Sequence, residues 1–314
     1  MRRVLIRAAG GYDKLEIVEE ADPKGAIDVR AIGVNYADCV VRMGLYASAK
    51  KYVGWPITPG FDIAGVAPDG RRVVAVTRFG GYASRVVVPE GQVFEIPDDV
   101  SFEQAAAFPT AFLTAAYALF ELAAPRPGMR ALVHSAAGGV GSALVQLLRI
   151  AECEVHGVVG SEHKVDSVPV DRVFVREWDG DYDIVFDANG YKTLRQSYAS
   201  LRPTGRLIIY GFHSMMPRSG GKPDWMRLAW GWLRTPRFNP LDMTGENRSV
   251  MGFNLSYLFD HNDRLQELMG RLLGWWQEGR LTLPKITTYP LDRVADAHRD
   301  LESGQTIGKL VLVP

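Results

Sequence analysis

A turn of small residues at regular spacing is the part of this sequence best suited to chemistry. Ala136, Gly138 and Gly141 follow the pattern Ala-x-Gly-x-x-Gly, after a short apolar run at residues 131–134 and before an apolar-periodic run from Ser142. This order predicts a strand, a tight turn and a helix. We therefore expect the small residues to admit a pyrophosphate close to the backbone at the helix N-terminus, where free N–H groups and the helix dipole favour anions.

The turn predicts dinucleotide binding, the alternative being a glycine-rich turn of some other α/β protein. The residues after the next strand indicate which dinucleotide is preferred. Proteins that select NAD place Asp or Glu near the end of this strand to hold the ribose 2′-hydroxyl. Here the predicted strand at residues 154–159 is followed by Ser161 and Lys164, and a small residue with a cation suits a 2′-phosphate. Glu162 lies past the strand end and is expected to face solvent. We predict NADP over NAD, the alternative being a solvated loop in which Lys164 contacts nothing.

Composition limits the classes of partner and the compartment. The chain has 314 residues and a formal net charge of 0, a length that suits two domains and a balance that argues against nucleic acid or an acidic membrane as the main partner. Its cysteines, Cys39 and Cys153, lie far apart and in no metal spacing, which favours a reducing compartment and a cytoplasmic location. The first apolar run is broken by Arg7 and no run reaches 18 apolar residues, so we expect neither a signal peptide nor a membrane span.

The elements that must position such a site come in two styles. Residues 1–100 consist of short β-like runs between Gly, Pro and Asp turns, a spacing typical of a compact antiparallel, barrel-like domain. These runs are residues 4–6, 15–18, 28–32, 72–76 and 83–88. From Phe102 onward strands and helices alternate, as a parallel doubly wound sheet requires.

The second style opens with a predicted helix at residues 102–122 that is interrupted at Pro109. Further strands are expected at residues 172–175, 184–186, 206–210 and 249–253, followed by a helix at residues 262–278. The last predicted strand, residues 309–313, returns to the β-rich style of the opening. The simplest architecture therefore places both ends of the chain in one domain, with the nucleotide-binding unit between them.

Six ordered segments together resemble a known family. They are residues 32–46 (IGVNYADCVVRMGLY), 59–66 (PGFDIAGV), 102–119 (FEQAAAFPTAFLTAAYAL), 135–141 (SAAGGVG), 201–211 (LRPTGRLIIYG) and 307–314 (IGKLVLVP). The chain resembles the zinc-independent quinone oxidoreductase branch, which includes zeta-crystallin, of the medium-chain dehydrogenase/reductase superfamily. Residues 252–260 (GFNLSYLFD) and 275–281 (WWQEGRL) look closest to the synaptic vesicle membrane protein homologues within that branch.

The resemblance implies an α/β fold of two domains. A GroES-like β-barrel domain would comprise residues 1–111 and 259–314, and a Rossmann domain with a doubly wound parallel sheet would comprise residues 112–258. The family also implies a homodimer joined through the Rossmann sheets. The apolar strand at residues 249–253 suits such a covered edge.

The same resemblance allows the presence of a metal to be tested on single residues. The zinc alcohol dehydrogenases of the superfamily have a Cys ligand where this chain has Asn35, and a His-Glu pair where it has Phe61 and Asp62. A catalytic zinc needs three N, S or O ligands around an open position. No cysteine lies between Cys39 and Cys153 to build a four-cysteine structural zinc lobe. We predict an enzyme with no metal site.

Without a metal, the resemblance implies hydride transfer from NADPH to a quinone or to a double bond conjugated to a carbonyl, because the developing charge then delocalises onto oxygen. Asn35 and Tyr46 are the catalytic residues that the resemblance implies, since an amide and a phenol can hydrogen-bond the nicotinamide carboxamide, the ribose or the substrate oxygen. The alternatives are an Asn that holds a loop carbonyl and a Tyr that packs a turn. His134 is expected to be a packed strand residue, and the proton to come from solvent.

The family's cofactor contacts transfer to matching positions of this chain. They are Thr114, Ala137, Gly138, Gly139, Val140, Gly141, Ser161, Lys164, Tyr210, Gly211, Phe253 and Leu255. Two departures suggest a weaker hold on the adenine end: Val175 stands where the family usually has a Tyr, and Pro169 interrupts an expected helix. Asp187 and Asn189 are expected to be turn and cap residues.

Three hypotheses about function result. The leading one is an NADPH-dependent reductase of quinones or α,β-unsaturated carbonyls, and the alternatives are a non-catalytic nucleotide-binding or trafficking protein and a trans-acting enoyl reductase. Residues 224–243 bear on the choice, because they concentrate Trp225, Trp230 and Trp232 among arginines, and their first ten residues suit an amphipathic helix. We interpret this segment as a mobile wall of an apolar substrate cleft. The alternatives are a helix packed on the Rossmann domain or at the dimer seam, and a patch for peripheral membrane contact.

Overall fold

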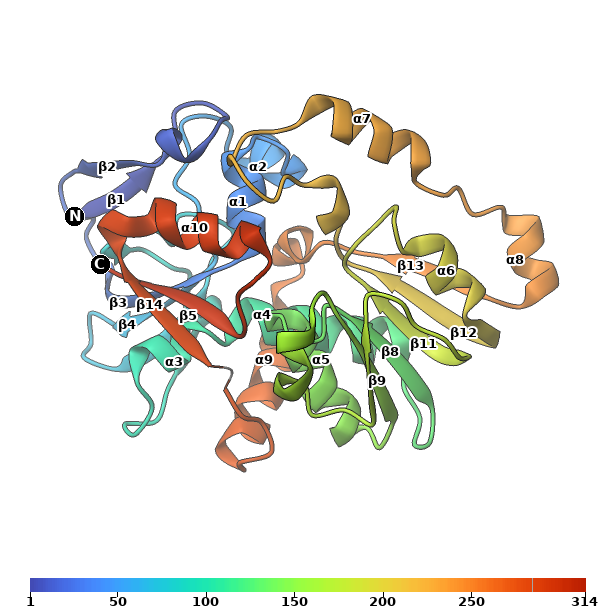
Figure 1. The fold of residues 1–314 in the computed structure, drawn as a ribbon. Helices are drawn as coiled ribbons and strands as arrows, with labels where there is room; N and C mark the ends of the chain where they lie inside the picture. The colour runs from blue at the N-terminus through green and yellow to red at the C-terminus, as the bar shows by residue number, and fades with distance from the viewer. Residues whose placement is uncertain (284) are drawn as a thin grey trace.

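Two β-sheets of different design organise the chain, which the computed structural model describes at residues 1–283 and 285–314 (Figure 1). The first sheet has seven strands in the order β14-β15-β3-β4-β5-β7, with β6 paired to β3. Its strand pairs are antiparallel except for β14 and β15, which are parallel. The strands are β3 (Ile27–Val34), β4 (Asp62–Val66), β5 (Arg72–Val76), β6 (Arg85–Val86), β7 (Val93–Glu95), β14 (Ile286–Pro290) and β15 (Lys309–Val313). A separate antiparallel pair, β1 (Arg2–Leu5) with β2 (Glu16–Glu19), lies beside it.

The second sheet has six strands, all parallel, in the order β10-β9-β8-β11-β12-β13. They are β8 (Arg130–His134), β9 (Glu154–Val159), β10 (Arg172–Val175), β11 (Tyr182–Asp187), β12 (Leu201–Ile209) and β13 (Ser249–Gly252). In sequence order of the strands this is the 3-2-1-4-5-6 arrangement of a dinucleotide-binding sheet, whose ligand crevice lies outside the carboxyl ends of the strands where the order reverses. That point falls between β8 and β11.

These two sheets confirm the predicted fold class of a GroES-like domain and a Rossmann domain. The bounds predicted for β5, β9, β10 and β15 agree with the structure, and those of the remaining predicted strands differ by a few residues at their ends. Three strands, β4, β7 and β14, were not predicted. Each is short and lacks a strict apolar alternation, and β4 contains the polar Asp62 and the glycine Gly65, both of which weaken a strand pattern.

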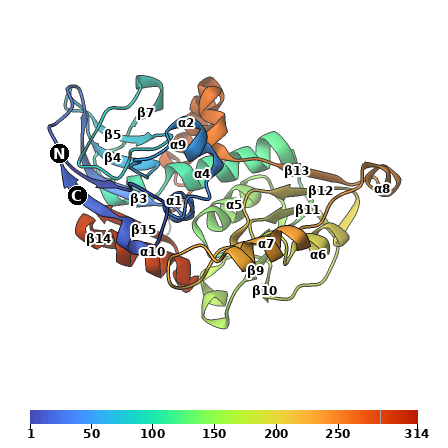
Figure 2. The ribbon, with the colours of Figure 1, turned by 90° about the horizontal axis from the view of Figure 1, so that it is seen from above.

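Both ends of the chain contribute to the seven-stranded unit, as the two views show (Figures 1 and 2). Strand β15 pairs with β3 in antiparallel register, with Val311 opposite Gly33. Helix α10 (Val294–Ser303) covers this region and buries Val294, Ala297 and His298. Strand β15 thus lies between β14 and β3, in a sheet whose other strands come mostly from the first hundred residues.

The predicted helix at residues 102–122 consists of three consecutive pieces: α3 (Phe102–Ala106), α4 (Pro109–Ala116) and a π-helical turn at Tyr117–Ala123. Pro109 is the first residue of α4, where a missing N–H leaves no helix hydrogen bond unmade. The stretch Phe102–Ala123 is long and apolar enough to cross a membrane by length and composition, but 72% of its apolar window is buried within the protein. It is a core helix of the fold.

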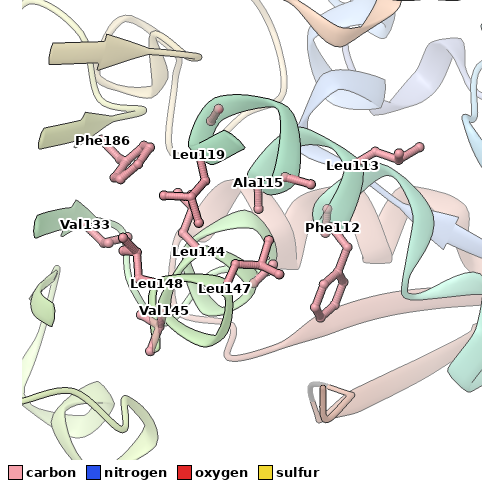
Figure 3. Packing of buried hydrophobic residues seen from close by; sticks show 14 of the residues in the cluster. Phe112, Leu113, Ala115, Leu119, Val133, Leu144, Val145, Leu147, Leu148 and Phe186 are labelled. Carbon is pink, nitrogen blue, oxygen red and sulfur yellow. The ribbon is translucent and has the colours of Figure 1, made fainter. Parts of the chain in front are cut away.

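The largest core lies where α4 meets α5 (Gly139–Ile150) and the parallel sheet (Figure 3). In the close view Leu119, in the π-helical turn after α4, lies beside Leu144 of α5, and Phe112 of α4 belongs to the same core. Helix α9 (Asn262–Gln277) adds Leu265, Leu268, Met269 and Leu272 to the same core. The apolar face of α9 therefore packs on the nucleotide-binding unit, and the domain boundary at residues 258–259 stays a prediction.

The remaining helices connect the sheets or lie on the surface. They are α1 (Tyr36–Arg42), α2 (Ala47–Tyr52), α6 (Leu194–Ala199), α7 (Trp225–Arg234) and α8 (Pro240–Glu246), with 3-10 turns at Tyr12–Lys14, Glu90–Gln92, Glu162–Ser167, His213–Met215, Leu255–Asp260 and Leu291–Arg293. Helices α7 and α8 follow the outer edge of the molecule between β12 and β13 (Figure 1). The helix predicted in the tryptophan-rich segment is α7.

Candidate active site

The glycine turn lies at the carboxyl end of β8, as predicted, and α5 begins in it. Gly138 caps α5 in an extended conformation, and the N–H of Ser142 donates to its carbonyl at 2.8 Å. A Cβ on Gly141 would lie 2.2 Å from the carbonyl oxygen of Ser135, so only glycine fits there. The helix starts at Gly139, earlier than the predicted Ser142, because two of its first three residues are glycines without an apolar side chain to reveal the helical period.

The residues before and at the start of β15 lie directly on this turn. The N–H of Gly308 faces the carbonyl of Ala137 at 3.4 Å, and Lys309 Cδ lies 3.0 Å from the position that a Cβ on Gly139 would take. Lys309 comes from the seven-stranded sheet, whereas Gly139 begins the helix of the parallel sheet. The alkyl chain of one lysine therefore joins the two units at the predicted pyrophosphate site.

The ammonium of Lys309 ends in a buried polar chain that contains Asn35. Lys309 Nζ donates to Asn35 Oδ1 at 2.7 Å and to the Val34 carbonyl at 3.0 Å, and it lies 3.8 Å from Asp62 Oδ2. Asn35 Nδ2 donates to the same Asp62 Oδ2 at 2.8 Å, while Asp62 Oδ1 accepts from the N–H of Thr110 at 2.9 Å and from its hydroxyl. Burial lowers the pKa of Lys309, and Asp62 opposes this. Burial also raises the pKa of Asp62, and Lys309 opposes that shift, so each charge offsets the burial of the other.

Asp38 fixes the backbone from which the Asn35 side chain extends. Its Oδ2 accepts from the Asn35 N–H at 2.8 Å and from the Tyr82 hydroxyl at 2.9 Å, and its Oδ1 accepts from the Gly60 N–H at 3.0 Å. Asn35 and Asp38 form a capping box at the start of α1. Burial raises the pKa of Asp38 to about 7 against the effect of these hydrogen bonds. Asn35 is thereby held at both its backbone and its amide.

Tyr46, the second predicted catalytic residue, donates its phenol hydrogen to Asn254 Oδ1 at 2.9 Å. Its ring packs edge-on to Phe61 and Phe79, at centroid distances of 6.0 and 6.2 Å. Burial raises the pKa of the phenol, so it stays protonated at neutral pH. Asn254 stands two residues after β13 and joins Tyr46 of the first unit to the edge of the parallel sheet.

Most of the residues predicted to bind the cofactor gather around the carboxyl ends of the parallel strands. Tyr210 and Gly211 follow β12, and Phe253 follows β13, with its N–H donating to the Ile209 carbonyl at 3.2 Å. The Phe253 ring lies 6.5 Å from the ring of Tyr210 and 5.0 Å from that of Tyr117. Three further predicted contacts come from other elements: Thr114 of α4, Val140 of α5 and Leu255 of the turn after β13. Thr114 and Leu255 are buried.

Ser161 and Lys164 lie just past the end of β9. Ser161 precedes the 3-10 turn Glu162–Ser167, and the ammonium of Lys164 donates to the carbonyls of Gly304 and Thr306 at 2.5 and 2.9 Å. The alternative in which Lys164 contacts nothing is therefore wrong. Arg176, which the sequence did not single out, reaches across from the end of β10 and donates from Nε to the Gly160 carbonyl at 3.1 Å. It places a second cation at the end of β9.

Comparison with known proteins agrees with this geometry. Residues 159–312 match the family model of the zinc-binding dehydrogenases. The whole chain aligns with 84% of the rat synaptic vesicle membrane protein VAT-1 homolog at 33% identity, and with 98% of the rat quinone oxidoreductase at 26% identity. The chain belongs to the medium-chain dehydrogenase/reductase superfamily. The quinone oxidoreductase of Thermus thermophilus, whose structure was solved alone and with NADPH, covers the whole chain at 29% identity with a TM-score of 0.84, and the chain covers all of that protein in turn.

A zinc ion does not fit the residues that this medium-chain dehydrogenase/reductase offers at the predicted position. The groups there are the amide of Asn35, the carboxylate of Asp62 and the ammonium of Lys309, and the ammonium repels a second cation. Elsewhere in residues 1–283 and 285–314, Cys39, His298 and Glu302 could form a metal-ligand cluster. The guanidinium of Arg42 already binds His298 Nδ1 at 2.9 Å and Glu302 Oε1 at 2.6 Å, so this cluster is a closed ion-pair network.

His134, Asp187 and Asn189 hold the fold around the turn of this medium-chain dehydrogenase/reductase. His134 is buried on β8 with its Nε2 at 3.0 Å from the Ser197 hydroxyl, which donates to Asp187 Oδ2 at 2.8 Å. Asp187 Oδ1 accepts the N–H of Asn189 at 2.7 Å. Burial lowers the pKa of His134, so it is neutral near pH 7. These contacts agree with the structural roles expected for them.

The sequence did not predict a role for Lys309 or its pairing with Asp62. It also did not predict that Asn254 accepts the hydrogen of Tyr46. Lys309 lies 274 positions from Asn35, and Asn254 lies 208 positions from Tyr46. One signal was present: a lysine at the start of an otherwise apolar strand has to find an acceptor if it is buried. Nothing in the spacing says which acceptor that is.

Proposed function

We propose that the protein is an NADPH-dependent reductase of quinones or α,β-unsaturated carbonyl compounds that works without a metal ion. The observation that carries this proposal is the position of Lys309, which packs against Gly139 of the dinucleotide turn and binds Asn35 with its ammonium. One side chain, that of Lys309, therefore connects the predicted pyrophosphate site to Asn35 and Asp62 of the GroES-like unit. The oxidoreductase relatives support the same class of reaction.

NADPH, when bound, supplies a hydride from its nicotinamide ring. The turn at Gly138 to Gly141 would hold the pyrophosphate on the N-terminus of α5. Ser161, Lys164 and Arg176 would face the 2′-phosphate, and Tyr210, Gly211 and Phe253 would border the nicotinamide half. Lys164 donates to two backbone carbonyls, so its ammonium would exchange one of these for a phosphate oxygen.

The poor fit of zinc to this set of residues bears on which acceptors the chain can reduce. A simple ketone or aldehyde that accepts a hydride places the developing negative charge on one oxygen and needs a strong electrophile, whereas a quinone or enone spreads that charge by conjugation. The site offers neutral amide donors, such as that of Asn254, and the ammonium of Lys309 is already engaged by three oxygens nearby. Conjugated acceptors match this set.

The test is NADPH consumption by the purified, metal-stripped protein against a panel of quinones, enones, simple ketones and saturated aldehydes. We expect turnover with quinones or enones, more slowly with NADH, and no change on adding zinc. Turnover restricted to simple ketones and aldehydes, or dependent on zinc, would contradict the proposal. Binding of NADPH without turnover of any acceptor would favour the non-catalytic nucleotide-binding alternative.

A second candidate function, contact with a membrane surface, is favoured by one specific observation on α7. Its outer face exposes Trp225 (70%), Met226 (84%), Trp230 (56%) and Trp232 (66%), while the inner face packs Gly231 against Met215. The tryptophans lie on the outside, which favours a surface contact over the wall of a cleft. The guanidinium of Arg234 lies 5.3 Å from the centre of the Trp230 ring, and Trp with Arg is a combination that suits the headgroup region of a bilayer. Arg218, Lys222 and Arg237 are further basic residues close to α7 in sequence.

Sedimentation with vesicles tests this second candidate. We expect binding to vesicles that contain anionic lipid, and loss of that binding in the Trp230→Ala/Trp232→Ala double variant with NADPH affinity unchanged. The matched control is Trp275→Ala, a tryptophan of α9 that packs against Phe120 and is remote from α7 in sequence. No sedimentation of the unmodified protein would refute the membrane contact and leave the reductase proposal in place.

A further inference from the structure

The side-chain amide of Asn254 accepts an unusual set of hydrogen bonds. Asn254 is half-buried at the carboxyl end of β13, directly after Phe253, whose ring lies beside those of Tyr210 and Tyr117. Its Oδ1 accepts the N–H of Ser256 at 3.0 Å, the Ser256 hydroxyl at 2.7 Å and the Tyr46 hydroxyl at 2.9 Å. Three donors therefore converge on one amide oxygen.

This convergence fixes which way the amide points. The backbone N–H of Ser256 can only donate, so the atom that faces it must be the oxygen of Asn254 and not the nitrogen. The Ser48 hydroxyl lies 2.7 Å from the Ser256 hydroxyl and completes the chain behind it. The amide nitrogen, Nδ2, then points away from the network, and within the part of the chain that the structure describes it makes no hydrogen bond to protein.

The same network commits the hydrogen of Tyr46. A phenol has one hydrogen, and the Tyr46 hydrogen is donated to Asn254 Oδ1. Burial raises the pKa of the phenol, so the phenol keeps this hydrogen. Because the hydrogen is already donated to Asn254, none remains for a substrate oxygen. Asn35 is engaged in a similar way, by Lys309 on its oxygen and by Asp62 on its nitrogen. Among these polar groups the Asn254 amide has both of its hydrogens free.

We propose that Asn254 donates a hydrogen bond from Nδ2 to the carbonyl oxygen of the acceptor, and that Tyr46 acts through it as a positioning residue. This inference rests on the proposed reductase function. NADPH, when bound, would supply a hydride to the β-carbon of the acceptor; the electron pair of the acceptor's double bond would move onto its carbonyl oxygen, which Asn254 would face, and water would supply the proton that completes the product. Donors at Oδ1 polarise the amide and make its N–H groups stronger donors to the developing oxyanion.

Kinetics of the purified holoenzyme give the first test. Removing one such donor lowers the rate by about 100-fold in comparable sites, so we expect Asn254→Ala to lower kcat for enones by about this factor while the Kd for NADPH is unchanged. Asn254→Asp, which replaces the donor by an anion, should be at least as slow. Tyr46→Phe should lower kcat less than Asn254→Ala, and in the Asn254→Ala background it should have no further effect, because its role requires the amide.

A readout that does not depend on turnover separates this inference from the reductase proposal. The probe is ¹³C-carbonyl 2-cyclohexen-1-one bound to the protein with NADP⁺, whose carbonyl stretch is followed by difference infrared spectroscopy. A hydrogen bond from Asn254 shifts this band to lower frequency in the unmodified protein, and the shift disappears in Asn254→Ala. An unshifted band, or an Asn254→Ala variant with kcat within about threefold of the unmodified protein, overturns the role of Asn254 while enone reduction by the unmodified protein still stands. A shifted band with no turnover of any acceptor supports the hydrogen bond and refutes the reductase function.

Discussion

Replacement of Lys309 by methionine tests the buried chain that joins the two units. Methionine keeps most of the apolar volume but removes the ammonium, which leaves the wholly buried carboxylate of Asp62 with hydrogen bonds from Asn35 and Thr110 and no counter-charge. Breaking a buried pair from one side costs about 3–5 kcal/mol. With roughly 2–4 °C of Tm per kcal/mol for a domain of this size, Lys309→Met should unfold some 6 °C or more below the unmodified protein.

The stability that Lys309→Met loses relative to the unmodified protein should increase with pH. Burial raises the pKa of Asp62, and Lys309 holds it back, so removal of Lys309 raises the folded-state pKa further above the unfolded value. The folded variant then binds more protons than the unfolded chain in the weakly acidic range, and its stability falls as pH rises through that range. Urea unfolding at pH 5 and pH 8 should therefore show a larger deficit at pH 8.

The chain offers a matched control in Lys164→Met. Lys164 is buried like Lys309, but its ammonium donates to the carbonyls of Gly304 and Thr306 rather than pairing with a carboxylate. Its removal leaves no buried charge and should cost only about 1–3 kcal/mol without the pH dependence. The double variant Lys309→Met/Asp62→Asn should recover part of the loss. A deficit for Lys309→Met no greater than that for Lys164→Met, or one equal at both pH values, would refute the reasoning.

Three other substitutions or measurements follow from the site and the sheet edge. Gly141→Ala should abolish NADPH binding in a fluorescence titration, because its Cβ would lie 2.2 Å from the Ser135 carbonyl oxygen, and binding at the original affinity would contradict the role of the turn. Lys164→Glu should weaken NADPH binding and leave NADH binding nearly unchanged, whereas equal Kd values for the two cofactors in the unmodified protein would rule out a 2′-phosphate preference. Light scattering should give a mass twice the 34.7 kDa of one chain, since β13 is an edge strand of the parallel sheet and suits pairing with a second copy, and a mass of one chain would exclude the dimer.

The parts of the fold that the sequence predicted are those with a local signal. The strand, glycine turn and helix around Gly138 and Gly141 carry their pattern within about 20 residues, and β9 and β10 were bounded by their apolar runs. The chain order of the resembling segments predicted the GroES-like and Rossmann units. Strand β4 was missed because it begins with the charged Asp62, and the burial of that aspartate depends on Asn35, Thr110 and Lys309, which lie beside it only in the folded chain.

The predicted catalytic residues show the same limit at the level of single contacts. Asn35 and Tyr46 were singled out by resemblance, and the structure places both in polar networks, but their partners Lys309 and Asn254 come from distant segments. The side-chain types fix what each residue can donate or accept. Which hydrogens remain for a substrate depends on long-range packing, and this is why the sequence favoured the phenol while the geometry favours the amide of Asn254.

The place of β15 has a consequence for how the protein is made. Lys309 supplies the ammonium that meets Asn35 and the side chain that lies on Gly139, and β15 fills the gap between β14 and β3. During translation the other groups named in the site leave the ribosome earlier, so the Asp62 carboxylate is made before the Lys309 ammonium that offsets its charge. A nascent chain halted before residue 309 would hold an incomplete sheet and an unneutralised carboxylate. The site is therefore complete only once β15 has been synthesised and has paired with β14 and β3.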